Sequence, residues 1–182
     1  MRKIIKLIIL SIFISCSLQK KTIMNKKHFI FYTEYNQFYI SSDKGKFLSS
    51  EILTDETSYT SRLSLENNAL VVFTQSYGNI EGEIEVLPKP NIIGDYSNYD
   101  HVVEGGINVQ SGELQILNCP DNNLELSLKI DPGTYRVRIY SSNLDSVKET
   151  DLTNDTDDDY YRIELWKSDD MERKVLKQYE YK

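Results

Sequence analysis

The chain has 182 residues, a formal net charge of −7 and 40% hydrophobic residues, a composition typical of a globular domain and not of a disordered one. The acidic balance argues against a nucleic-acid binder, because such proteins neutralise phosphates with basic residues. Two cysteines and two histidines exclude a disulfide scaffold and argue against a conventional zinc site, so we expect neither metal nor cofactor.

The first 16 residues contain basic residues, then an apolar run, then a small residue directly before a cysteine. Three basic residues among the first six precede an apolar run from Leu7 to Ile14. This run is too short to span a bilayer as a helix, but it fits the apolar region of a secretory signal. Ser15 then precedes Cys16, and a small residue before a cysteine resembles the lipobox of bacterial lipoproteins. The resemblance implies lipidation of Cys16.

This interpretation divides the chain into a signal peptide over 1–15, a lipidated tether over 16–27 and a single domain over 28–182. The protein would be lipid-anchored in the cell envelope, at the outer membrane or on the periplasmic face, through Cys16. Loss of the leader would leave 18 of the 21 basic residues against 28 acidic ones, a net charge of −10. The alternative is a cytoplasmic protein that starts at Met24, since the residues from Met24 to Lys27 resemble an ordinary cytoplasmic start.

From His28 onward, short alternating or apolar runs predict strands separated by turns. The expected strands are 28–40, 69–74, 81–87, 101–109, 113–118, 124–130, 134–140 and 160–166. A short helix is predicted from Glu56 to Leu65, with Thr54 or Asp55 as its cap. The tail from Met171 could form a last strand or a short helix.

The spacing of these runs determines the expected fold class. Parallel strands need long crossover connections, usually helices, and the chain leaves no room for them. We therefore predict an all-β protein, an antiparallel β-sandwich of about eight strands with one short helix, preceded by the signal segment. Gly105 and Gly106 predict a bulge or a close backbone approach.

A polar loop between Ser141 and Asp159 is the most acidic part of the chain. Its carboxylates are Asp145, Glu149, Asp151, Asp155, Asp157, Asp158 and Asp159. The Asp-x-Asp-x-Asp spacing from Asp155 resembles the start of an EF-type calcium loop, but Tyr160 and Trp166 occupy the positions that need glycine and glutamate. A solvated loop is therefore favoured, and irregular Ca²⁺ binding remains the alternative.

A row of carboxylates can imitate the charge of a nucleic-acid backbone and attract a basic protein. The residues predicted to contact such a partner are Asp155, Asp157, Asp158, Asp159 and Tyr160. The chain also has 13 tyrosines, among them Tyr32, Tyr35 and Tyr77, and tyrosine is common both in protein-binding patches and in sugar sites. A glycan- or envelope-binding module is therefore the alternative function.

Catalytic motifs give no support for an enzyme. The sequence contains no Gly-x-Ser-x-Gly, His-Glu-x-x-His or phosphate-binding glycine loop. His101, between Asp100 and Glu104, could act as a base, but no nucleophile is marked nearby. Cys119 is expected to be a small, half-buried residue. We therefore expect no catalytic residues.

Four short motifs suggest a family. In chain order they are Tyr35-Asn36-Gln37-Phe38-Tyr39-Ile40, Thr54-Asp55-Glu56, Leu126-Ser127-Leu128 and Pro132-Gly133-Thr134-Tyr135-Arg136. Their order resembles that of the competence-type nuclease inhibitors, a family of small β-sandwich proteins. The resemblance covers roughly residues 32–166 and implies a non-enzymatic inhibitor or immunity-like protein. The expected partner is a basic nuclease or toxin, bound by a monomer without nucleic acid.

Overall fold

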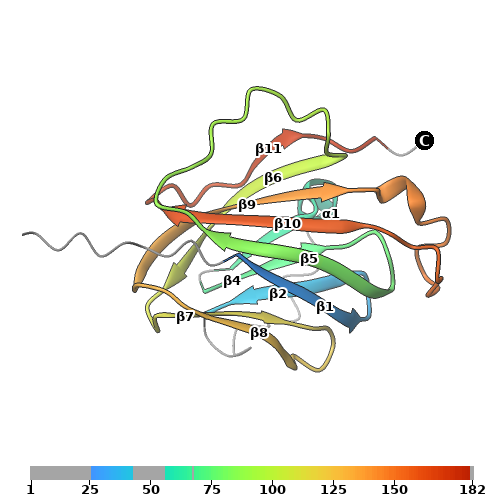
Figure 1. Cartoon of the computed structure of the whole chain (residues 1–182), viewed down its shortest axis with the longest axis horizontal. Helices are drawn as coiled ribbons and strands as arrows, with labels where there is room; N and C mark the ends of the chain where they lie inside the picture. Colours follow the sequence, from blue (N-terminus) through green and yellow to red (C-terminus); the bar gives the residue numbers. More distant parts are fainter. Residues whose placement is uncertain (1–25, 43–55, 67, 181–182) are drawn as a thin grey trace, which may run out of the picture.

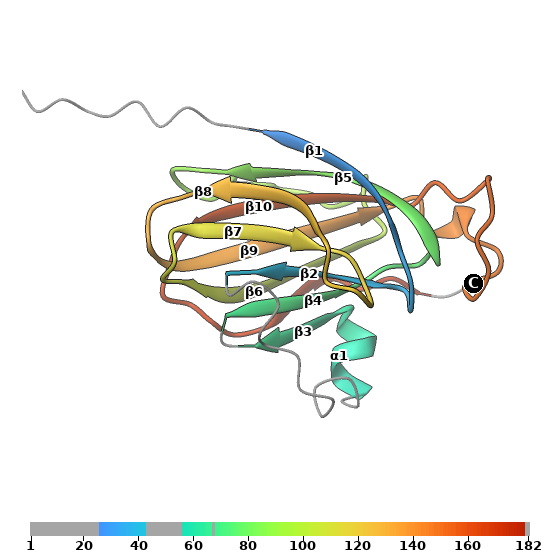
Figure 2. The same ribbon diagram turned by 90° about the horizontal axis from the view of Figure 1, so that it is seen from below.

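The computed structural model describes residues 26–42, 56–66 and 68–180, which form two β-sheets packed face to face (Figures 1 and 2). The strands are β1 (Lys27–Thr33), β2 (Gln37–Ser41), β3 (Leu63–Glu66), β4 (Ala69–Phe73), β5 (Gly78–Val86), β6 (His101–Val109), β7 (Glu113–Leu117), β8 (Leu124–Lys129), β9 (Gly133–Ser142), β10 (Tyr160–Lys167) and β11 (Lys174–Lys177). Helix α1 (Glu56–Ser61) and a 3-10 turn, η2 (Leu144–Ser146), complete the elements. No helix within the described ranges is long and apolar enough to cross a membrane. The leader, Cys16 and the predicted cap residues lie outside these ranges.

The sheets have the strand orders β1-β5-β10-β9-β6-β11 and β3-β4-β2-β7-β8. The predicted all-β sandwich with one short helix is confirmed, with more strands than the eight expected. One expected strand, 28–40, divides at a turn into β1 and β2, which belong to different sheets. All pairs are antiparallel except β5 with β10, which run parallel from Glu81–Tyr160 to Val86–Leu165. The connection between these two strands consists of β6 to β9, so no crossover helix is needed.

Helix α1 is shorter than the sequence predicted, because Arg62 ends it. Arg62 has a φ of 55°, which no α-helix continues. Leu63 then begins β3 and pairs with Val72 of β4, and its side chain is fully buried. Gly105 leaves the space that this requires, since a Cβ there would lie 2.9 Å from Leu63 Cδ2. At Gly105 it is therefore side chains that come close, whereas the predicted close backbone approach is found at Gly106, where a Cβ would lie 2.4 Å from Met171 Cα; the pairing with β9 is continuous through both, without a bulge.

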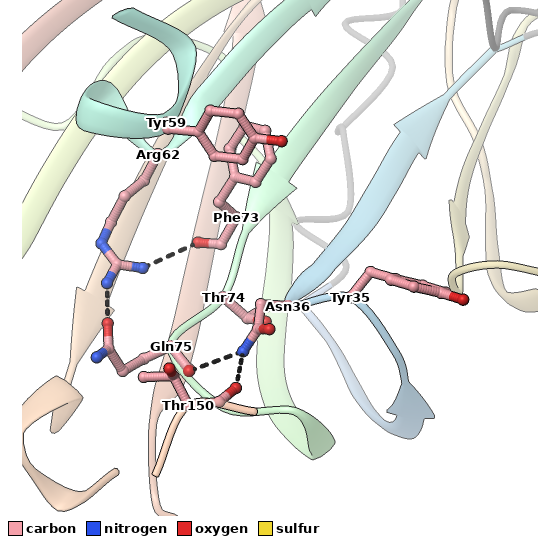
Figure 3. Close-up of a pocket in the computed structure, with 8 residues that line it drawn as sticks. All are labelled: Tyr35, Asn36, Tyr59, Arg62, Phe73, Thr74, Gln75 and Thr150. Atoms are coloured by element: carbon pink, nitrogen blue, oxygen red, sulfur yellow. Dashed lines mark hydrogen bonds between the residues drawn. The ribbon is translucent and has the colours of Figure 1, made fainter. Parts of the chain in front are cut away.

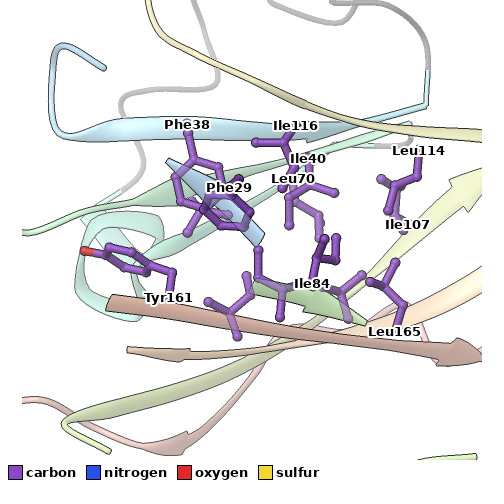
Figure 4. Packing of buried hydrophobic residues seen from close by; sticks show 14 of the residues in the cluster. Phe29, Phe38, Ile40, Leu70, Ile84, Ile107, Leu114, Ile116, Tyr161 and Leu165 are labelled. Carbon is purple, nitrogen blue, oxygen red and sulfur yellow. The ribbon is translucent and has the colours of Figure 1, made fainter. Parts of the chain in front are cut away.

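The core fills the space between the two sheets (Figure 4). Phe38 of β2 lies 6.0 Å from Phe29 of β1 and 5.9 Å from Tyr161 of β10, measured between ring centroids. Rings from both sheets therefore meet at the centre of one half of the sandwich. The loops at the two ends of the sandwich lie outside this core.

The outer face of the six-stranded sheet carries charges that pair with one another. Arg138 and Arg136 donate to Glu104 over 2.6 and 3.0 Å. Glu83 is 9% exposed and accepts a hydrogen bond of 2.7 Å from Lys26. Apart from Nη2 of Arg136, which is buried without a hydrogen-bond partner, these charges are paired within the chain, so this face is a poor candidate for binding a partner.

Candidate partner-binding surface

Residues 145–159, here called the acidic loop, project from one end of the sandwich between β9 and β10 (Figure 1, orange). Their base is fixed by Leu144, which is fully buried and whose amide donates to the Asp100 carboxylate over 2.8 Å. The hydroxyl of Tyr179 donates to Asp145 over 2.7 Å, so the C-terminal segment also holds the loop. Val147 is buried as well. The loop therefore has a defined position on the domain.

Three of the five predicted contact residues remain near the surface of this loop. Asp155 and Asp158 are exposed, and Asp157 is half-buried. Burial raises the pKa of the Asp157 carboxyl, with a smaller contribution from the charge of Asp159. Glu149 is exposed as well, so a row of carboxylates faces solvent.

Asp159 and Tyr160 have other roles than the sequence suggested. Asp159 is 3% exposed, and its carboxylate accepts hydrogen bonds from the amide of Ser76 at 3.1 Å and the hydroxyl of Tyr161 at 2.6 Å. Tyr160 is half-buried at the start of β10, where burial and the nearby Glu83 carboxylate raise its pKa to about 12. A carboxylate buried in this way cannot contact a partner directly, so Asp159 is removed from the candidate surface.

The arrangement of the acidic loop gives no support for a metal site. No group of three or more histidine, cysteine, aspartate or glutamate side chains in the described part of the chain is placed to hold a metal ion. The side-chain oxygen of Asn154 accepts a bond from the backbone amide of Thr156 over 3.1 Å, which is an Asx turn, and the Asp157 carboxylate accepts one from the backbone amide of Asn154 over 3.2 Å. These contacts order the loop without a cation.

Two other segments pack against the acidic loop and extend the surface. The side-chain amide of Asn36, in the turn between β1 and β2, donates to the carbonyl oxygens of Gln75 at 3.0 Å and Thr150 at 2.6 Å. At the start of β5, a Cβ on Gly78 would lie 2.8 Å from Thr153 Cγ2, so backbone and loop touch there. The turn, the segment after β4 and the acidic loop therefore form one continuous end of the molecule.

A pocket of about 290 Å³ opens on this end (Figure 3). Its lining residues are Tyr35, Asn36, Tyr59, Arg62, Phe73, Thr74, Gln75 and Thr150. The rings of Tyr59 and Phe73 lie 4.7 Å apart between centroids and form one wall. The Arg62 guanidinium is 5% exposed and donates to the carbonyl oxygen of Phe73 and the side chain of Gln75. The pocket thus combines aromatic walls with amide and hydroxyl groups.

Unfavourable backbone conformations concentrate at this pocket. Five non-glycine residues of the described ranges have positive φ, and three of them are asparagines, which tolerate this region. The other two are Tyr35, with a φ of 56°, and Arg62, with a φ of 55°, and both line the pocket. Residues in such unfavourable conformations cluster at functional sites. The backbone conformations of Tyr35 and Arg62 are therefore a second observation, independent of the pocket's shape, that makes this pocket a candidate functional site.

Three exposed tyrosines are here called the tyrosine rim: Tyr35 and Tyr59, which line the pocket, and Tyr32 near the end of β1 are 64%, 52% and 45% exposed. Tyr32 also contacts Tyr77 edge-on, with 6.5 Å between ring centroids. Tyrosines are enriched in protein interfaces. The sequence had suggested Tyr35 among many tyrosines but not Tyr59. One signal in the sequence could have singled out Tyr35: the pair Tyr35-Asn36 stands in a hairpin turn, where Asn-Gly is the usual pair.

His101 and Cys119 are structural residues. His101 is fully buried, its Nδ1 accepts a bond from the amide of Tyr179 at 3.2 Å, and its Nε2 donates to the carbonyl oxygen of Ser61 at 2.9 Å. Burial lowers its pKa to about 4, so the ring is neutral at pH 7. Cys119 is 4% exposed, and its sulfur accepts a bond from the hydroxyl of Tyr39 at 3.0 Å. Neither side chain is placed to react with a substrate.

Comparisons with known proteins give a likeness in fold. No protein-family model matches the chain, and no curated protein matches it in sequence. The crystal structure of ComJ from Bacillus subtilis, described as an inhibitor of the DNA-degrading activity of NucA, superposes with a TM-score of 0.60. The match covers 80% of this chain and 99% of ComJ, with 12% sequence identity. A second structure, described as crocagin biosynthetic gene J, gives a TM-score of 0.49 at 13% identity over 79% of this chain and 97% of that one. The chain therefore has a fold like that of a nuclease inhibitor.

Proposed function

We propose that the protein is a non-enzymatic, membrane-anchored inhibitor that binds a basic DNA-degrading nuclease through the acidic loop and the tyrosine rim. The observation that carries this proposal is the ordered acidic loop beside exposed tyrosines, on a fold similar to that of ComJ, an inhibitor of a DNA-degrading activity. In this proposal the partner is a protein, and the inhibitor acts as a monomer.

The charge of the acidic loop supports a basic partner. Residues 145–159 contain seven carboxylates and a single basic residue, Lys148. A nuclease that holds DNA must present positive charge to phosphates, and a row of carboxylates offers it a similar field. Such fields accelerate association and weaken as salt is added. Exposed tyrosine rings supply contact area at low entropic cost, which charge alone does not provide.

The direction of β1 supports anchoring at the opposite end of the domain. Strand β1 begins at Lys27, paired with Ile84, and ends at Thr33, paired with Gly78 beside the acidic loop. Its seven residues span about 20 Å, since a strand rises about 3.3 Å per residue. A lipid on Cys16, upstream of β1, would therefore leave the acidic loop directed away from the membrane. Labelling with a radioactive fatty acid, lost in Cys16→Ser, distinguishes this anchoring from a cytoplasmic start at Met24.

A capture experiment tests the proposed partner. Full-length protein in detergent is immobilised and exposed to lysate of the source cells at low and high salt, and the released proteins are identified and assayed for DNA degradation. We expect a basic nuclease that salt releases and that the free protein inhibits. Salt-resistant binding to envelope polysaccharide, with no nuclease captured, would instead support the glycan-binding module.

Charge-matched variants make the experiment specific. The loop variant is Glu149→Gln, Asp151→Asn, Asp155→Asn and Asp158→Asn, all at exposed positions. The control variant removes the same number of exposed carboxylates elsewhere: Glu81→Gln, Glu125→Gln, Asp131→Asn and Glu172→Gln. We expect the loop variant alone to lose inhibition, since both variants change the net charge equally.

A further inference from the structure

We infer that the end of the ladder between β1 and β5, next to the acidic loop, binds a basic side chain of the partner. The side chains that would hold it are Tyr32, Glu34 and Tyr77, here called the β1–β5 cluster. This inference rests on the proposed function for the nature of the partner and adds the residues that recognise it.

The register of β1 and β5 brings these three side chains together. The pairing ends with Thr33 opposite Gly78. The next position therefore places Glu34 opposite Tyr77. Side chains alternate along a strand, and Thr33 is fully buried, so Tyr32 and Glu34 share the outward face. Tyr77 then stands opposite Glu34 and diagonal to Tyr32, within reach of both for a side chain of its length.

Two aromatic rings of the β1–β5 cluster are placed to contact a cation. The rings of Tyr32 and Tyr77 lie 6.5 Å apart between centroids and at 86° to each other. Tyr32 is 45% exposed and Tyr77 is half-buried, so both rings reach the surface. The face of a tyrosine ring attracts a cation within about 6 Å of its centroid, and groups of such rings form the aromatic cages that bind cationic ligands.

Glu34 supplies negative charge beside these rings. Burial and then the charge of the Glu34 carboxylate raise the pKa of Tyr77, whose hydroxyl donates a hydrogen bond to that carboxylate. No ion pair within the described ranges of the chain includes Glu34. A carboxylate has about four lone-pair sites, so one bond from Tyr77 leaves room for a cation. The charge of Glu34 is therefore available to a basic side chain from outside the chain.

The β1–β5 cluster adjoins the acidic loop and lies away from the paired charges on β5. Glu83, which accepts the bond from the lysine before β1, stands opposite His28, about 20 Å along the strand from Glu34. Charges at that separation are largely screened in physiological salt. At the near end, a Cβ on Gly78 would lie 2.8 Å from Thr153 Cγ2, so β5 touches the acidic loop beside Tyr77. The field at the cluster is therefore that of Glu34 and the acidic loop.

Tyr35 follows Glu34 directly and borders the cluster. Its ring is 64% exposed and points away from the other residues that line the pocket (Figure 3). After burial and Glu34, the Tyr35 phenol is a smaller cause of the raised pKa of Tyr77, so the two hydroxyls are near each other. Glycine or asparagine would fit the φ of 56° at lower cost, and packing does not require so exposed a ring. A contact with the partner gives a reason for tyrosine at this turn.

Two short peptides test the inference without any nuclease. Acetyl-Gly-Arg-Gly-amide and its citrulline counterpart, which has nearly the same shape but no charge, are titrated at low salt into full-length ¹⁵N-labelled protein in detergent micelles. Arginine is the probe because its planar guanidinium stacks on aromatic rings. We expect the arginine peptide alone to shift the amide signals of Tyr32, Glu34 and Tyr77. Its δ-methylene protons should move upfield, because a ring shields protons above its face.

Variants assign binding to the β1–β5 cluster. Glu34→Gln removes the charge but keeps an oxygen that can accept from Tyr77, and Tyr32→Leu removes an exposed ring. We expect each to weaken arginine-peptide binding about threefold, the size of one exposed charge pair or cation–π contact. The matched controls are Asp131→Asn, an exposed carboxylate just before β9, and Tyr59→Leu, a 52% exposed tyrosine outside the cluster. Both controls should bind as the wild type does.

The amide spectra of the variants also report whether each one folds. Equal binding of the citrulline peptide, equal weakening in Glu34→Gln and Asp131→Asn, or no shift at all would overturn the inference. Since no nuclease is used, these outcomes are independent of the capture experiment, and failure of one proposal is distinguishable from failure of the other.

Discussion

Replacing Tyr35 by glycine and by alanine separates the strain in the turn from the contribution of the ring. Both substitutions remove the same ring contacts, so the difference between them reports the backbone. A residue with a Cβ pays about 1–2 kcal/mol in the left-handed region, which Tyr35 occupies with a φ of 56°. Glycine avoids this cost but loses about 0.5–1 kcal/mol more conformational entropy on folding. We therefore expect Tyr35→Gly to be about 0.5–1 kcal/mol more stable than Tyr35→Ala.

Urea unfolding followed by the fluorescence of Trp166 measures this difference. Trp166 is the single tryptophan and is 7% exposed, so its emission should change when the core opens. The free energies of the two variants are compared at equal denaturant slopes. An alanine variant as stable as the glycine variant would refute the strain argument. Unimpaired partner binding by both variants would refute the claim that the strain serves the interface.

Three further predictions concern the interior. Gly82→Ala should lower the free energy of unfolding by about 2 kcal/mol or more, because its Cβ would lie 2.3 Å from the carbonyl oxygen of Tyr161; the denaturant midpoint measures this. Asp159→Ala should lower the free energy of unfolding by about 2–4 kcal/mol, because it leaves buried donors unpaired. It should change the rate of nuclease association no more than Asp158→Ala does, and stopped-flow measurements of that rate test this. His101 has a pKa lowered to about 4, so it stays neutral in the folded protein down to about pH 5. In the unfolded chain the same ring gains a proton below about pH 6.5. The free energy of unfolding should therefore fall by about 2 kcal/mol between pH 6.5 and pH 5. His101→Gln should remove that part of the pH dependence, and an unchanged slope would contradict the assignment.

The sandwich could be predicted from the sequence because alternation is a local property. Leu126 and Leu128 show which face of β8 turns inward, and the short connections exclude crossover helices. The end of helix α1 could not be predicted in this way. Arg62 adopts a left-handed conformation that its residue type disfavours, and Leu63 belongs to a strand only because β4 lies beside it.

The candidate partner-binding surface was only partly predictable for the same reason. The carboxylates of the acidic loop are consecutive in sequence, so their clustering was visible. Spacing does not tell whether a carboxylate turns inward, and Asp159 does so to accept bonds from segments far away in the chain. The pocket combines Tyr35, Tyr59, Gln75 and Thr150 from four separate segments, and only the packing of the sheets brings them together.

The most direct test of the account is inhibition of the captured nuclease by the wild-type protein, the loop variant and the control variant over a range of salt. The account predicts that wild type and control inhibit equally, that the loop variant does not, and that the association rate of wild type falls steeply with salt. Equal inhibition by the loop and control variants, or inhibition insensitive to salt, would contradict the claim that the acidic loop binds the partner.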